Sequence, residues 1–247
     1  MSKVPFLAKA NVENNDTESE RTRMRILDAA AHVLSIKGFA GTRLTDVAES
    51  AEIPPSAIYD HFMTRDDLIE EVMYRGISYM RQHLQQTLDA LPPDTAPMDR
   101  IMAAVEAHLR NELQLSDYCT AAIRNSGQLP EKLSKRQKKE EAAYGRIWQS
   151  LFFDAAAAGE VDPELDVTLE MLLSLGALNW VAEWWDPRRG SVDDIVAKAQ
   201  LILRRGLTSP GSSTATAASP RTGTAKPGIR RHLFGRKRVP LPARRRS

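Results

Sequence analysis

The stretch RLTDVAESAEIPPSAIYDHF, residues 43–62, decides the fold of this chain. Its small and aliphatic residues recur at helical spacing on both sides of Glu52 and Ile53, which we interpret as a tight turn. Pro54 and Pro55 fit the start of the second helix, because the amides of a first helical turn have no acceptor within the helix. This pair of short helices predicts a helix-turn-helix, whose second helix lies in the major groove of DNA.

Helical patterns continue on both sides of this stretch. Upstream, Thr17-Glu18-Ser19-Glu20 is a capping box that opens a helix ending at Gly38. Downstream, Thr64 caps a long helix that runs towards Leu91. Further helices are predicted near residues 97–115, 117–126, 130–158, 163–185 and 191–206. No segment alternates with the period of a strand, so we predict an all-α protein of about nine helices.

Composition excludes several classes of protein. The 247 residues contain one cysteine, Cys119, which rules out an internal disulfide framework or a multi-cysteine metal site and fits a reducing cytoplasm. The five histidines show no metal-ligand spacing, and no glycine-rich phosphate loop is present. We therefore expect no enzyme activity, no metal and no cofactor, and a helical enzyme remains a remote alternative. No apolar run approaches the length of a membrane span, so we expect no membrane partner.

Charge is distributed unevenly along the chain. Residues 208–247 contain ten Lys or Arg and no Asp or Glu, whereas the preceding residues contain 24 basic and 32 acidic residues. The domains we predict are a flexible arm over 1–16, a helix-turn-helix domain over 17–80, a second helical domain over 81–207 and a disordered basic tail over 208–247. The tail either adds contacts to DNA phosphates or is a solvated end.

Four short strings carry a family resemblance: Arg25-Ile26-Leu27-Asp28-Ala29-Ala30, Gly38-Phe39-x-Gly41-Thr42, Asp46-Val47-Ala48 and Ile58-Tyr59-x-His61-Phe62. Together they resemble the TetR/AcrR family of bacterial transcriptional regulators over residues 20–75. The resemblance implies a cytoplasmic, nucleoid-associated homodimer whose N-terminal domains bind a palindromic operator in double-stranded DNA. It also implies a C-terminal domain that dimerises and binds a small effector, which releases the repressor from its operator.

The resemblance also assigns residues to the DNA. By match to the family, Thr42, Tyr59 and His61 bind phosphate, and Arg65 replaces a lysine that does the same. The candidates for base or groove contact are Arg43, Pro55, Ser56, Ala57 and Asp60. Tyr59 and Phe62 have a second interpretation as core residues, and Asp60 as a solvated acid. Two positions depart from the family: Glu52 stands where glycine is usual, and Pro54-Pro55 where Ser-Lys is frequent. Glu52 therefore predicts either a different turn or a strained one.

Aromatic residues in the C-terminal half indicate where an effector binds. The candidate ligand-binding residues are Arg146, Trp148, Phe152, Trp180 and Trp184. The string Leu178-Asn179-Trp180-Val181-x-x-Trp184-Trp185 is similar to a branch of the family that senses acyl-coenzyme A thioesters. The basic residues of 135–139, together with Arg146, fit an anionic ligand with an apolar acyl group, or they form an ordinary charged helix face paired with Glu140 and Glu141. The alternatives are an aromatic core, and a regulator of drug efflux that senses lipophilic cations.

Dimerisation is predicted for the last two helices. The residues we assign to it are Leu172, Leu175, Leu178, Val196, Ala199 and Leu203. The helix near 163–185 is apolar on more than one stripe, which favours burial on two sides. The resemblance implies a four-helix bundle formed with the partner subunit, and the alternative is that these residues belong to the core of one subunit.

Overall fold

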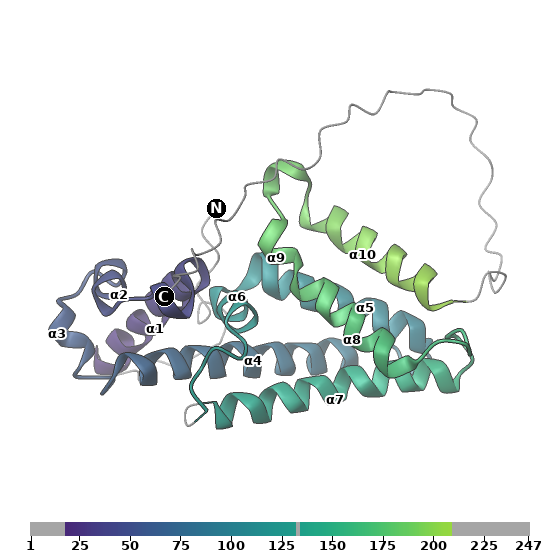
Figure 1. Cartoon of the computed structure of the whole chain (residues 1–247), viewed down its shortest axis with the longest axis horizontal. Coiled ribbons are helices and arrows are strands. Elements are labelled where there is room, and N and C mark those ends of the chain that lie inside the picture. The colour runs from purple at the N-terminus through teal and green to yellow at the C-terminus, as the bar shows by residue number, and fades with distance from the viewer. Residues whose placement is uncertain (1–17, 132–133, 209–247) are drawn as a thin grey trace, which may run out of the picture. The chain divides into compact units, whose positions relative to one another are not determined.

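The computed structural model describes residues 18–131 and 134–208. These residues form helices and no strand, which confirms the all-α prediction. The helices are α1 Glu18–Gly41, α2 Leu44–Ser50, α3 Pro55–Ile58, α4 Arg65–Asp89, α5 Pro97–Arg110, the π-turn η1 Asn111–Leu115, α6 Asp117–Arg124, α7 Lys135–Ala157, α8 Val167–Asn179, α9 Val181–Trp184, the 3-10 turn η2 Pro187–Arg189 and α10 Val192–Leu207. Figure 1 shows α1, α2 and α3 gathered around one end of the long helix α4.

A first hydrophobic core holds α1, α2 and α3 against the N-terminal half of α4. Ile26 and Leu27 on α1, Val47 on α2, Ile58 on α3 and Leu68 on α4 are each 1% exposed or less. α1 bends at Gly38, whose φ of 71° lies in the left-handed region that glycine adopts without strain. The bend turns the chain from α1 into α2, so the sequence signal at Gly38 marks a real change of direction.

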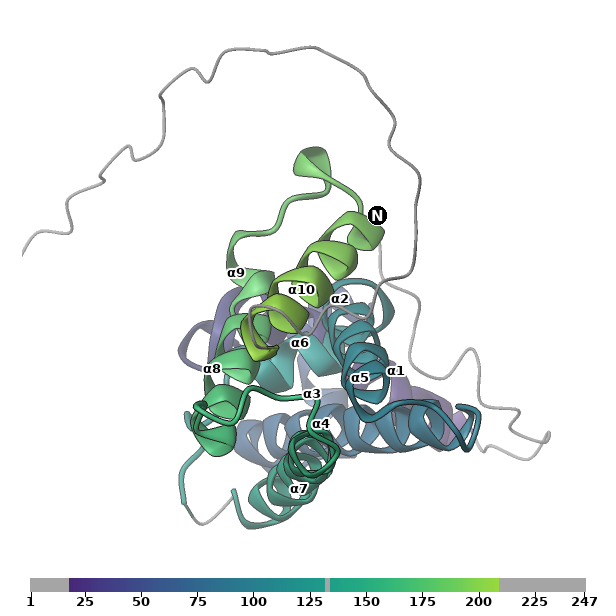
Figure 2. The same ribbon diagram turned by 90° about the vertical axis from the view of Figure 1, so that its right-hand side faces the viewer.

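A second core joins the C-terminal half of α4 to α5, α7, α8 and α10. Trp148 and Phe152 on α7 are completely buried at its centre, together with Ile101 on α5. Figure 2 views this end of the molecule, where α10 lies close to α5 and α8. The second core is independent of the first except through α4 and α6.

α6 is the short helix that touches both cores. Tyr118 and Ala121 belong to the first core, whereas Cys119 between them belongs to the second. α6 packs closely on α4 because Gly76 has no side chain: a Cβ there would lie 2.2 Å from the carbonyl oxygen of Tyr118. Any movement of α6 is therefore transmitted to α4 by direct contact.

Polar contacts also join α6 to α1. The Tyr118 hydroxyl donates to Asp28 at 2.8 Å, and burial raises the pKa of that Asp28 carboxyl. Asp117 lies 3.0 Å from the ring of His32. Asn125, just after α6, accepts a hydrogen bond from the amide of Phe39 at 2.7 Å. These contacts fix the helix-turn-helix region to α6.

The helices differ from the sequence prediction at several of their ends. α1 is assigned as far as Gly41, past the stop predicted at Gly38, and α3 ends at Ile58 instead of Phe62. The helix predicted over 97–115 changes from α to π geometry at Asn111. The helix predicted over 130–158 begins at Lys135. The helix predicted over 163–185 starts at Val167, because the Asp166 side chain accepts hydrogen bonds from the amides of Thr168 and Leu169. It is interrupted at Trp180 before α9.

Several predictions fall outside the described residues: the flexible arm over 1–16, the capping threonine at 17 and the basic tail beyond Thr208. Within the described residues, the capping roles of Thr64 and Ser191 are present, the latter as a complete capping box with Asp194. None of the described helices combines the length and the apolar character that crossing a bilayer requires.

Candidate DNA interface and effector cavity

The helix-turn-helix predicted over residues 43–62 consists of α2, a tight turn and α3. α2 ends in a Schellman motif: the amide of Ile53 donates to the carbonyl of Ala48 at 3.0 Å, and the amide of Glu52 to that of Glu49 at 3.1 Å. Glu52 has a φ of 54°, the left-handed conformation that this motif requires. The turn therefore keeps the shape that normally holds a glycine, and Glu52 bears the strain.

Most of the predicted DNA-contacting residues lie at the surface of α3, of the turn that follows it and of the connection before α2. Arg43, Pro55, Ser56, Tyr59 and Asp60 are exposed, and Ala57 and His61 are half-buried. Tyr59 is 60% exposed, whereas Phe62 is 5% exposed and packs in the first core. Burial thus separates two aromatic residues whose roles the sequence left open: Phe62 is core, and Tyr59 is available to a partner.

Thr42 and Arg65, also predicted to contact DNA, make hydrogen bonds within the protein. Thr42 is buried, and its hydroxyl donates to the carbonyl of Gly38 at 2.8 Å. Arg65 Nε donates to the carbonyl of Thr42 at 2.8 Å, and a second guanidinium nitrogen donates to the carbonyl of Phe39. The guanidinium also lies 4.7 Å from the centroid of the Phe39 ring. Arg65 therefore holds the start of α4 against the connection between α1 and α2.

This surface has no large positive charge. Lys37 Nζ lies 2.9 Å from Asp46 Oδ2, and this contact lowers the pKa of the Asp46 carboxyl. Glu49 and Glu52 are exposed nearby, and Arg43 is the exposed cation at the start of α2. Hydrogen bonds must therefore contribute much of any attraction between this surface and DNA phosphates.

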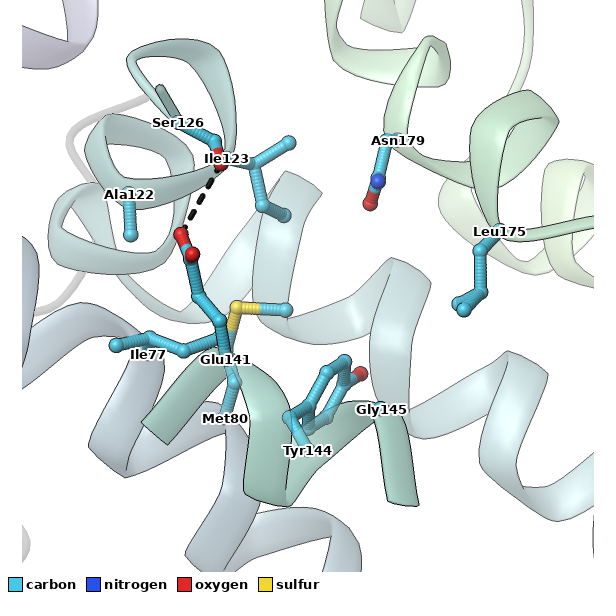
Figure 3. Close-up of a pocket in the computed structure, with 10 residues that line it drawn as sticks. All are labelled: Ile77, Met80, Ala122, Ile123, Ser126, Glu141, Tyr144, Gly145, Leu175 and Asn179. Atoms are coloured by element: carbon cyan, nitrogen blue, oxygen red, sulfur yellow. Dashed lines mark hydrogen bonds between the residues drawn. The ribbon is translucent and has the colours of Figure 1, made fainter. Parts of the chain in front are cut away.

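A cavity of about 280 Å3 lies between α4, α6, α7 and α8. The residues that line it are Ile77, Met80, Ala122, Ile123, Ser126, Glu141, Tyr144, Gly145, Leu175 and Asn179. Figure 3 shows Leu175 and Asn179 projecting from α8 towards the space that Tyr144 enters from α7. Glu141 points to the opposite side, where it accepts hydrogen bonds from Ser126 at 3.0 Å and Gln137 at 2.7 Å. The volume is near the lower end of the range for small-molecule sites.

Next to Tyr144 lies a buried group of aromatic and polar side chains. His108 Nδ1 on α5 is 2.9 Å from the Tyr144 hydroxyl oxygen. The ring centroids of His108, Tyr144 and Trp148 lie 6.1–6.3 Å from one another. Burial lowers the pKa of His108 to about 4, so its imidazole is neutral near pH 7, and burial raises the pKa of Tyr144.

The π-turn extends this group. Asn111 and Glu112 are 1% and 0% exposed, and Glu112 Oε2 lies 3.9 Å from His108 Nε2. Four buried atoms in this part of the described structure have no hydrogen-bond partner: His108 Nε2, Asn111 Oδ1, Asn111 Nδ2 and Trp148 Nε1. We call His108, Asn111, Glu112, Tyr144 and Trp148 the buried polar cluster. π-turns are often found at functional sites.

The structure does not bring the predicted ligand-binding residues together. Trp148 and Phe152 are fully buried, whereas Trp180 and Trp184 are 64% and 48% exposed. Arg146 is exposed beside the cavity residue Gly145. The division arises because Leu178 and Val181 turn into the core from α8 and α9, which leaves the two tryptophans on the other side of the chain. Trp148 packs against the cavity residue Tyr144, with their ring centroids 6.3 Å apart.

The predicted dimerisation residues also differ from one another in burial. Leu178 and Val196 are buried inside the subunit, and Leu175, Ala199 and Leu203 pack partly against the same core. Leu172 is 56% exposed. Other large apolar side chains exposed on α8, α9 and α10 are Leu169, Leu173, Trp180, Trp184, Leu201 and Ile202. The exposed apolar surface of these helices therefore contains Leu172 from the predicted set, together with these further residues.

Two features now define the class of protein: a helix-turn-helix with an exposed recognition helix, and a separate helical domain with a cavity for a small molecule. Residues 26–72 match the family of bacterial regulatory proteins called tetR, and residues 94–207 match the tetracyclin repressor-like C-terminal domain. The chain belongs to the TetR family of DNA-binding transcriptional regulators.

Known relatives match most of this chain. The transcriptional repressor KstR2 of Mycolicibacterium smegmatis is 27% identical over 201 residues, covering 78% of this chain and 95% of the relative. The regulator HbdR of an Aromatoleum species is 23% identical, covering 83% and 89%. Among solved structures, AibR in complex with isovaleryl coenzyme A and operator DNA matches with a TM-score of 0.64 at 17% identity, covering 73% and 97%. KstR2 of Mycobacterium tuberculosis matches with a TM-score of 0.63 at 18% identity, covering 76% and 95%.

The sequence prediction missed the buried polar cluster, although a signal was present. His108, Asn111 and Glu112 stand three and four residues apart, so they share one face of a helix. That face also carries Ile101 and Val105, which are completely buried. Three polar residues on the core side of a helix need partners, and this pattern indicates a functional or network position.

Proposed function

We propose that this protein is a repressor that binds a palindromic operator as a homodimer and is released by an acyl-coenzyme A thioester. The single observation that supports this most is the placement of the cavity: two of its walls are α4 and α6, the helices that hold the helix-turn-helix. The name of KstR2 as a repressor and the coenzyme A thioester in the AibR complex support the same function by similarity. A regulator of this kind acts in the cytoplasm, where its operator is.

The DNA-contacting surface we propose consists of Arg43, Pro55, Ser56, Ala57, Tyr59, Asp60 and His61. The exposed hydroxyl of Tyr59 is suited to phosphate, and the methyl group of Ala57 to a thymine methyl. We assign Thr42 and Arg65 a supporting role, because their hydrogen bonds already join α4 to the connection before α2, and that connection to α1. Only the exposed group determines which operator is bound.

The path from the effector to the DNA runs through α6. Ile123 and Ser126 line the cavity at the C-terminal end of this helix. Arg124 between them donates to the carbonyl of Ser35 on α1 at 2.7 Å and pairs with Glu183 on α9. A ligand that separates α8 and α9 from α6 changes these contacts, and it shifts the equilibrium only to the extent that it binds one state more tightly.

A thioester fits the cavity if only its acyl group enters and its nucleotide part stays outside. At roughly 30 Å3 per water-sized group, the cavity holds about nine such groups, which suits an acyl group and not a whole coenzyme A. The nucleotide part would then lie outside, near the exposed side chains of Arg146 and Lys138. Arg136 is less available, because it already pairs with Glu70 and Glu71.

DNA binding is tested with duplexes from the neighbourhood of the gene that encodes the protein. We expect one short inverted repeat to bind the dimer in a mobility-shift assay. Tyr59→Phe should weaken binding by about 1 kcal/mol without changing sequence preference, as for one lost hydrogen bond to phosphate. Phe62→Leu is the comparison variant, which alters a buried ring and should lower stability instead. Failure of every such duplex to bind at low salt would overturn the repressor function.

Effector specificity is tested by release of the operator complex. The panel consists of acyl-coenzyme A thioesters, the matched free acids and lipophilic cations. We expect release by thioesters alone. Release by the cations with the thioesters inactive would instead establish the regulator of drug efflux.

A further inference from the structure

The buried polar cluster has more hydrogen-bonding capacity than its own side chains use. His108 Nε2, both amide atoms of Asn111 and Trp148 Nε1 are buried without a partner in the described structure. Each such atom opposes folding, because its hydration is lost and not replaced. Their concentration within one turn of α5 and η1 and the adjacent part of α7 therefore indicates a function other than stability.

The cluster adjoins the cavity through two residues. Tyr144 lines the cavity and lies 2.9 Å from His108. Asn179, on the opposite wall in Figure 3, also acts on His108, since it partly opposes the effect of burial on the pKa of that imidazole. The cluster thus lies directly behind the part of the cavity wall that Tyr144 forms.

The atoms of the cluster determine which chemistry it accepts. Trp148 Nε1 and Asn111 Nδ2 carry N–H groups and only donate. The cavity residues and the cluster include the carboxylates of Glu141 and Glu112 and contain no Lys or Arg. A carboxylate or phosphate would be desolvated there without a cation, and an ammonium group would meet the N–H donors. An uncharged oxygen acceptor needs no counter-ion, and it can accept hydrogen bonds from the N–H groups of Trp148 and Asn111.

We propose that the buried polar cluster binds an uncharged carbonyl oxygen at the far end of the effector's acyl group, with the side chains of Trp148 and Asn111 as donors. This inference rests on the proposed function, in which an acyl thioester occupies the cavity. It deepens that function by naming an oxo-acyl thioester as the class of effector that the protein distinguishes from plain acyl thioesters.

The test uses two matched pairs of ligands and the full chain. One pair is octanoyl coenzyme A and the oxo-octanoyl thioester with its ketone on the penultimate carbon. The other is cyclohexanecarboxyl coenzyme A and its ring-oxo counterpart. Affinity is measured by calorimetry, and release by the concentration of each thioester that frees half of the operator complex. We expect at least one oxo ligand to bind roughly tenfold more tightly than its partner.

Variants connect this preference to the cluster. Trp148→Phe keeps an aromatic ring and removes the N–H, and Asn111→Leu removes both amide atoms at similar volume. Both should bind oxo and plain thioesters equally. Trp185→Phe is the matched control, because Trp185 also has a buried indole nitrogen without a partner but neither lines the cavity nor contacts the cluster rings. It should keep the preference. Operator affinity without ligand shows that each variant is folded.

The outcomes separate this inference from the proposed function. If thioesters release the operator but oxo and plain ligands bind equally, the inference is wrong and the proposed function stands. The same holds if the preference survives in both cluster variants, or if an amino-acyl thioester binds more tightly than the oxo ligand. If no thioester binds or releases the operator, the proposed function fails and the inference fails with it.

Discussion

Glu52 occupies a left-handed backbone position that the end of α2 requires and that a side chain makes costly. We expect Glu52→Gly to stabilise the protein by about 1 kcal/mol, because the strain is relieved while both Schellman hydrogen bonds remain. Glu49→Gly is the matched control: Glu49 is an exposed residue within α2, and glycine there should destabilise by about 1 kcal/mol. Chemical denaturation measures both, and changes of the same sign would contradict the strained turn.

His108 makes stability depend on pH. Its pKa is lowered from 6.5 to about 4 by burial, so the unfolded chain takes up a proton at a higher pH than the folded protein does. Above pH 6.5, His108 therefore does not reduce the free energy of unfolding. As the pH falls from 6.5 towards 4, His108 lowers that free energy by up to about 3 kcal/mol in total. We expect His108→Gln to flatten this decline in a series of melting temperatures. An unchanged slope in the variant would exclude His108 as its source.

At the scale of elements, α6 is the helix on which both domains depend. Its contact with α4 at Gly76 leaves no room for a methyl group, since the clash would be with backbone and not with a flexible side chain. We expect Gly76→Ala to destabilise the protein by about 1–3 kcal/mol, in spite of the higher helix propensity of alanine. Gly206→Ala in α10 is the control, because open space surrounds that position. Equal melting temperatures of the two variants would disprove the close packing.

At the scale of the whole molecule, α8 and α10 present an apolar surface that the other described residues of the subunit leave uncovered. Such a surface is expected where a second copy packs, and two copies place two recognition helices about one turn of DNA apart, roughly 34 Å. We propose that Leu172 and Ile202, which are 56% and 70% exposed, lie in the interface of the homodimer.

We expect Ile202→Glu to raise the dimer dissociation constant by roughly 100-fold or more, because a buried unpaired carboxylate costs several kcal/mol. Helix content should not change, since the side chain is exposed in the subunit. Analytical ultracentrifugation measures the dimer dissociation constant. Operator affinity should fall as the dimer dissociates. Gln149→Glu, an exposed change on α7, is the control. A stable dimer of the Ile202→Glu variant would place the interface elsewhere.

The sequence by itself determined the helix-turn-helix, the family and the all-α fold. Short-range signals were sufficient for these: the capping residues Thr64 and Ser191, the glycine at 38 and the helical spacing of apolar residues act within a few residues of one another. It also predicted that Ser56 and Asp60 are exposed, because exposure follows from helical phase once the buried residue Ile58 is known.

Only the tertiary structure decided which residues surround the cavity and which apolar residues are exposed. Tyr144, Asn179 and His108 meet although more than thirty residues separate each from the next, so no local pattern reports their contact. Trp180 and Leu178 are two residues apart and equally apolar, yet one is exposed and the other buried. The reason is physical: hydrophobicity gives the tendency of a side chain to leave water, while the packing of neighbouring helices decides which side chains can do so within one subunit.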